Sequence, residues 1–106
     1  MALYIVVHHP RDPDQPYAND WDPRTHTLRA FQTTPKWVRE HSQALQPGAR
    51  LLIHRCGWGD HPPVICCSVA VQEVTPYFII VTDVRDMEEL PPLQPMPGCG
   101  SYEWGD

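Results

Sequence analysis

Hydrophobic and polar positions divide this chain into runs that are mostly of the β type. Three of them are rich in β-branched and small apolar residues and end at proline, glycine or polar turns: Leu3–Val7, Arg50–Cys56 and Val64–Val74. Such residues fit the pleated, half-buried surface of a sheet. A fourth run, Tyr77–Val84, follows a Thr75-Pro76 turn and is predicted to pair with Val64–Val74 as a meander. The unbroken apolar character of Leu3–Val7 predicts a central strand buried on both faces.

One stretch carries a helical pattern. Thr34 is suited to the N-cap and Pro35 to the first helical position. The residues that follow at helical spacing form one stripe, made by Trp37, Val38, His41, Ala44 and Leu45. Because Pro47-Gly48 favours termination, one principal helix is predicted over Pro35–Leu45.

The remaining segments show neither the strand pattern nor the helical pattern of apolar residues. Arg11–Thr33 is polar and proline-rich and is predicted to be a long loop, which Tyr17 and Trp21 would hold against the body. From Asp86 the chain becomes acidic and then proline-rich, as in PPLQPMPG, a composition typical of polyproline-like wrapping. The expected fold class is mainly β (α+β). Residues 1–106 are expected to form a single domain with a proline-rich C-terminal tail from about residue 91.

The lengths of the apolar runs and the cysteines indicate the cellular location and the redox state that are expected. The apolar run Ala2–Val7 is too short for a signal peptide, and no run approaches the length of a membrane span. A cytoplasmic location is therefore expected, with the four cysteines reduced and no structural metal or other cofactor. Cys66 and Cys67 are neighbours in a predicted strand, so their side chains are expected on opposite faces, where a bridge between them is improbable.

The charge is unevenly distributed along the chain. The net charge is −5, but the segment from Arg24 to Arg55 holds six basic residues against Glu40 alone. A basic surface on an acidic protein attracts anions without general polyanion binding. The alternative is that solvated charges are segregated by chance, because proximity in sequence is not proximity in space.

Several short motifs resemble those of one superfamily. They are Pro47-Gly48-Ala49-Arg50 leading into LLIH, the stretch VICCSVAVQEVTP, and a late strand running to Leu90-Pro91-Pro92-Leu93. In order and spacing they resemble the PUA-like superfamily, especially EVE and ASCH domains. The resemblance implies a small closed β-barrel with one flanking helix and a cleft that binds nucleic acid, often a modified or flipped base. Ala49 departs from the pattern, since an acidic residue is usual there, and the chain is shorter than most EVE domains.

Two groups of side chains are candidates for that cleft. In the first, Trp58 would stack on a base, His54 would contact its edge and Arg55 would bind a phosphate. Strand alternation separates His54 from Arg55 unless the strand bends. The second group consists of His8 and His9, at the end of a strand, which would bind the ligand together with Trp21. The competing interpretation is a Trp58 that caps the barrel, a solvated Arg55 and two surface histidines.

Other functions use some of the same residues. His54, Cys56 and His61, joined by His9 or Cys99, would supply zinc ligands, although their spacing matches no closed structural pattern. Cys56 beside His54 or His61 is also a candidate nucleophile, with only Asp60 to orient the histidine. The leading hypothesis is a nucleic-acid- or nucleotide-binding domain without catalysis. A small enzyme or metal protein and a protein-interaction module are the alternatives.

Overall fold

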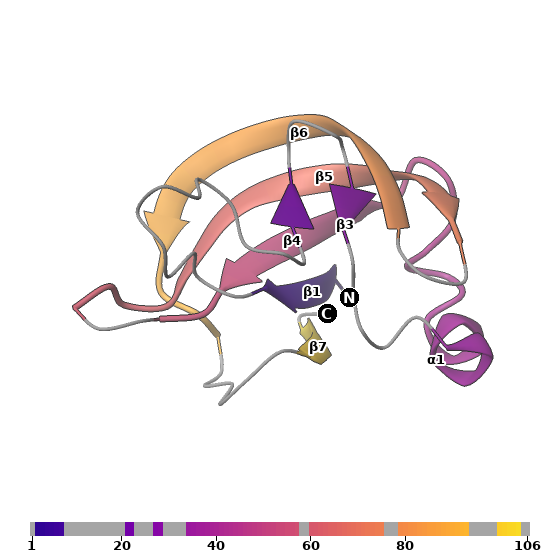
Figure 1. Cartoon of the computed structure of the whole chain (residues 1–106), viewed down its shortest axis with the longest axis horizontal. Helices are drawn as coiled ribbons and strands as arrows, with labels where there is room; N and C mark the ends of the chain where they lie inside the picture. The colour runs from indigo at the N-terminus through magenta and orange to yellow at the C-terminus, as the bar shows by residue number, and fades with distance from the viewer. Residues whose placement is uncertain are drawn as a thin grey trace.

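The protein, described by a computed structural model, is one strongly curved β-sheet with a short helix near one end (Figure 1). The structure describes residues 2–7, 21–22, 27–28, 34–57, 60–75, 79–93 and 100–104, with the backbone alone at 21–22 and 27–28. The strands are β1 (Ala2–Val7), β2 (Trp21–Asp22), β3 (Thr27–Leu28), β4 (Arg50–Arg55), β5 (Val64–Val74), β6 (Ile79–Leu90) and β7 (Gly100–Trp104). The helix is α1 (Pro35–Glu40). The predicted mainly β class is confirmed.

The sheet has seven strands in the order β2-β3-β6-β5-β4-β1-β7. Every neighbouring pair is antiparallel except β1 and β4, which are parallel. Strand β1 is thus interior, one position from the edge rather than central. Within the described residues no ladder joins β2 to β7, so the closed barrel that the resemblance implied is not found. The observed architecture is an open sheet that curls.

Register shifts explain much of the curvature. One shift separates Ile53 from His54 where β4 pairs with β5, and β5 and β6 share three more. Each extra residue bends its strand and increases the local twist. In Figure 1, β5 and β6 accordingly arch over β4.

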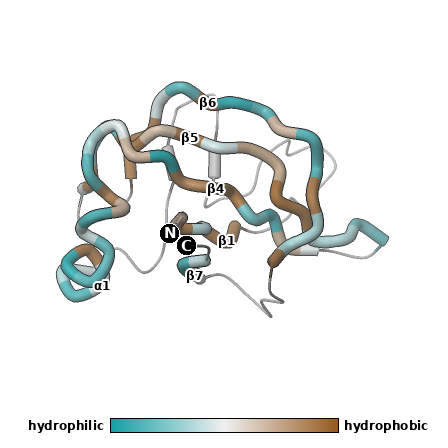
Figure 2. Tube along the Cα trace, turned by 180° about the vertical axis from the view of Figure 1, so that it is seen from behind, coloured by the Kyte–Doolittle hydropathy of each residue, from teal (hydrophilic) through white to brown (hydrophobic). Residues whose placement is uncertain are grey.

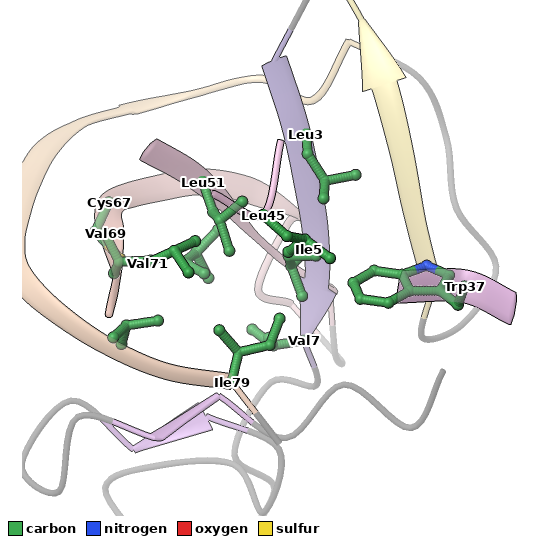
Figure 3. Packing of buried hydrophobic residues seen from close by; sticks show 12 residues of the cluster. Leu3, Ile5, Val7, Trp37, Leu45, Leu51, Cys67, Val69, Val71 and Ile79 are labelled. Atoms are coloured by element: carbon green, nitrogen blue, oxygen red, sulfur yellow. The ribbon is translucent and has the colours of Figure 1, made fainter. Parts of the chain in front are cut away.

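The main core fills the concave side of this arch. Its members from four strands point toward one another in Figure 3, and the labelled ones include Leu3, Ile5, Val7, Leu51, Cys67, Val69, Val71 and Ile79. Trp37 reaches this core from α1, and its Nε1 donates a hydrogen bond of 3.0 Å to Ser101 Oγ on β7. The helix is therefore joined to the edge of the sheet as well as to its core.

The helix begins as predicted and ends early. Thr34 Oγ1 accepts a hydrogen bond of 3.2 Å from the Trp37 backbone N–H, the expected N-cap contact. The α-helix then stops at Glu40 and turns follow, because His41 leaves helical geometry (φ −114°, ψ 24°) while its Nδ1 contacts Glu103 Oε1 at 2.8 Å. Leu45 is nevertheless buried in the main core, so the turn delivers the residue that the helical stripe was expected to place there.

Three strands lie where none was predicted. Strands β2 and β3 fall inside the predicted loop Arg11–Thr33, and β7 pairs with β1 beyond the proline-rich segment. Strand β6 continues to Leu90, past the predicted end at Val84 and through the acidic stretch. Figure 2 shows that β6 is largely hydrophilic where β1 and β4 are hydrophobic.

Candidate functional site

The carboxyl ends of the parallel strands β1 and β4 lie side by side and form one edge of the sheet, which carries the predicted site residue Arg55. Because the two strands are parallel, Val7 lies opposite Arg55, and the Cys56 backbone N–H donates to the Val7 carbonyl oxygen at 2.8 Å. At this edge Arg55, Cys66, Cys67 and Glu89 form a group that we call the Arg55 cluster. It is the part of the described structure that gathers the most chemically useful side chains.

Arg55 is the central member. Its guanidinium is partly buried, and Nη2 lies 3.4 Å from Glu89 Oε1, a long contact for an ion pair. Its Nε is buried and has no hydrogen-bond partner among the described residues. A buried N–H without a partner costs about 1–3 kcal/mol relative to a satisfied one. Because 31% of the Arg55 side chain is exposed and its contact with Glu89 is long, the structure is compatible with the interpretation of a solvated arginine and leaves guanidinium N–H groups for another partner.

The two neighbouring cysteines are closer than strand alternation predicts. Ile53 pairs with Cys67 and His54 with Ile65, so Cys66 is the extra residue of a bulge in β5. The two Sγ atoms are 3.9 Å apart, and Cys66 Sγ is 3.8 Å from the Ile53 carbonyl oxygen. The expectation that the two side chains point to opposite faces is wrong, because a bulge interrupts the alternation.

Electrostatics distinguish the two thiols. The Cys67 thiol, by hydrogen bonding, and then the Arg55 guanidinium lower the pKa of Cys66 against the opposing effect of burial. The hydrogen bond with Cys66 and burial raise the pKa of Cys67. Cys66 is thus the member of the pair that ionises first.

His54 is not part of this cluster. Its side chain lies on the opposite face of β4, only 1% of it is exposed, and a hydrogen bond of 2.7 Å joins its Nδ1 to Tyr102 Oη. Tyr102 also stacks on Tyr4, with ring centroids 4.9 Å apart. Burial lowers the pKa of His54 and raises that of Tyr102 to about 12. The prediction that His54 contacts a base edge is wrong, because the ring is enclosed within a second, smaller core.

The basic residues of the segment 24–55 that are described do not form one surface. Lys36 pairs with Glu40 at 3.9 Å on α1. Arg50 contacts Asp83 at 2.9 Å, at the opposite end of β4 from Arg55. Five strand steps of about 3.3 Å separate the two arginines by roughly 17 Å. Proximity along the sequence therefore does not bring Arg50 and Arg55 together in space.

The other predicted site residues either lie outside the described residues or are not grouped into a site. His8, His9, Trp58 and Cys99 lie outside the described residues, as does the side chain of Trp21, whose backbone is in β2. Cys56 is partly buried and His61 is exposed. Within the described part of the chain, no three His, Cys, Asp or Glu side chains are grouped as metal ligands would be. With His54 held by Tyr102, the geometry does not favour the zinc or nucleophile arrangement built on His54, Cys56 and His61.

A cavity lies elsewhere. It has a volume of about 350 Å³ and sits between the turn after α1 and β5, where its lining includes Val38, Leu45, Pro47, Val71 and Glu73. Five of its nine lining residues are apolar, its polar members are Ser42, Gln46, Gln72 and Glu73, and it contains no cation. This hollow therefore adds nothing to the chemistry of the Arg55 cluster, which lies at the other end of β4.

Gly57 controls how the chain leaves β4 at the cluster. A Cβ atom at this position would meet Pro63 Cδ at 2.8 Å and the His61 carbonyl oxygen at 2.9 Å. Gly57→Ala is therefore expected to lower the free energy of unfolding by about 1 kcal/mol or more, through overpacking. Chemical denaturation measures the free energy of unfolding of this variant. Gly48→Ala is the comparison variant, because Gly48 has open space around it but a φ of +88°, so its substitution tests backbone strain and not crowding. A Gly57→Ala protein as stable as the wild type would show that the loop is not closely packed.

No protein-family model, curated protein or solved structure matches this chain. The class that the structure itself defines is a mainly β domain built on one curved sheet. None of the helical residues described forms a segment long and apolar enough to cross a bilayer. The assignment of function accordingly depends on the Arg55 cluster and on the motifs of the sequence.

Proposed function

We propose that the protein is a nucleic-acid- or nucleotide-binding domain of PUA-like type, and that Arg55 binds a phosphate of the ligand. The observation that carries this proposal is the partly exposed Arg55 guanidinium, whose Nη2 makes only a long contact of 3.4 Å with Glu89. The role proposed is binding without catalysis.

The chemistry of the guanidinium supports a phosphate ligand. Arginine presents its N–H groups in a planar fork that matches two oxygens of a phosphate or carboxylate. Glu89 is largely exposed, so a ligand oxygen can replace its long contact at little cost. Partial burial of Arg55 also lowers the local dielectric, which strengthens its interaction with an anion.

The location supports a site at the end of β1 and β4. His8-His9 follows β1 directly in the sequence, and Gly57-Trp58-Gly59 follows β4. Trp58 remains the predicted stacking residue, and His8 and His9 with Trp21 remain predicted contacts to the base. His54 is withdrawn from this set because its ring nitrogen is bound to Tyr102.

A pair of arginine variants tests the proposal. Arg55→Ala should weaken the binding of short labelled single strands and lower the slope of log K against log salt by about 0.7, the value for one phosphate contact. Arg39→Ala removes the same charge from α1, away from the cluster, and should leave that slope unchanged. Equal effects of the two variants would mean that net charge, not the Arg55 cluster, governs binding.

A further inference from the structure

The bulge in β5 creates a pair of thiols that the proposed function does not use. Cys66 and Cys67 are both free, and their Sγ atoms lie 3.9 Å apart. Adjacent residues have Cα atoms about 3.8 Å apart, below the usual range of about 4.4–6.8 Å for a disulfide. The pair therefore does not favour closing on itself, and both sulfur atoms remain available to a third atom.

The surroundings prepare one of the two sulfurs for bonding. Arg55 and the Cys67 thiol stabilise a thiolate at Cys66, which is partly exposed. Cys67 is only 4% exposed and belongs to the main core, against which Cys66 packs. A reagent therefore meets Cys66 first, and a second bond to Cys67 forms within a site that water enters poorly.

We propose that Cys66 and Cys67 form a two-thiol site for a thiophilic centre, and that neutral trivalent arsenic is the chemistry that fits it best. Zinc needs four ligands, and no group of three or more candidate ligands occurs among the residues described. This inference shares Arg55 with the proposed phosphate site but does not require that a nucleic acid binds there.

The reaction with phenylarsine oxide balances without a redox partner. The arsenic–oxygen double bond breaks and two arsenic–sulfur bonds form, one to each cysteine. The oxygen leaves as water with one proton from each thiol. Arsenic remains trivalent, so neither an oxidant nor a reductant is consumed.

The test titrates the folded, reduced protein with phenylarsine oxide and follows intact mass and remaining thiols. The expected result is one arsenical per chain and the loss of two thiols. The adduct should survive an excess of a monothiol and be released by a dithiol. Cys66→Ser and Cys67→Ser should each weaken retention by roughly 100-fold or more, because a two-point attachment becomes single. Cys56→Ser and Cys99→Ser should retain the wild-type behaviour.

Three outcomes would overturn the proposal. They are no adduct on the native protein, an adduct that a monothiol removes, and an adduct that Cys56→Ser or Cys99→Ser abolishes while Cys66→Ser does not. Since Cys67 is buried, Cys67→Ala serves in place of Cys67→Ser if circular dichroism shows that the serine variant is unfolded.

Discussion

Replacing Leu51 by alanine is expected to lower the free energy of unfolding by about 2–5 kcal/mol, the largest effect that we predict. Leu51 is fully buried in β4, between Leu3 of β1 and Val69 of β5. All three belong to the main core inside the arch, so the truncated side chain leaves a cavity that rigid strands on both sides keep open. Equilibrium denaturation in urea measures the loss.

Leu90→Ala is the matched control. Leu90 also lies in a strand, at the end of β6, but is 44% exposed. Its truncation should change the free energy of unfolding by about 0.5 kcal/mol or less. If the two variants lose similar stability, the concave side of the sheet is not where the core lies.

His54→Phe is expected to cost about 1–3 kcal/mol, because it leaves the buried Tyr102 hydroxyl without its partner. The hydrogen bond of 2.7 Å between them is the polar contact that justifies a histidine in this small core. The double variant His54→Phe/Tyr102→Phe should recover most of that loss, since replacing both partners by apolar groups can be nearly neutral. Urea denaturation of the wild type, His54→Phe, Tyr102→Phe and the double variant gives the coupling energy between the two side chains. A double variant no more stable than His54→Phe would contradict this account of the pair.

The same histidine gives the stability a pH dependence. Burial lowers the pKa of His54 in the folded protein below its ordinary value of 6.5. As the pH falls below this value, the unfolded chain therefore takes up a proton that the folded protein does not. Stability should fall with pH in that window, by at most about 1.4 kcal/mol per pH unit from this residue, until the lowered pKa is reached. His54→Phe should lack the part of this pH dependence that comes from His54. If the free energy of unfolding changes between pH 7 and pH 5.5 by the same amount in His54→Phe and in the wild type, His54 is not its source.

The strands that the sequence predicts are those that carry their own hydrophobic signal. Leu3–Val7 and Val64–Val74 are apolar enough to be recognised, and the structure places a strand at each. The later part of β6 is different, because Asp83 to Leu90 is polar and mostly exposed, and its strand geometry depends on pairing with β5. Strand β7 has only five residues and contributes Tyr102 to the small core, and this short run shows no periodicity that would predict a strand.

The candidate site was predictable only in part, for geometric reasons. Alternation already indicated that His54 and Arg55 face opposite ways, and the structure bears this out. The contact of Arg55 with Glu89 spans 34 positions, and the pairing of β5 with β6 that creates it follows from register shifts. The approach of Cys66 to Cys67 depends on a single bulge. Such irregularities leave no mark in the hydrophobic pattern.

One measurement tests the central claim, that the Arg55 cluster binds a phosphate, most directly. Labelled single strands of DNA and RNA, modified and unmodified, are titrated with the wild-type protein and with Arg55→Ala over a range of salt concentrations. The account predicts that the wild type binds at least one of them. It also predicts that Arg55→Ala lowers its salt slope by about 0.7, one phosphate contact. A wild-type protein that binds none of them at low salt, or a salt slope identical in the two proteins, would contradict the claim.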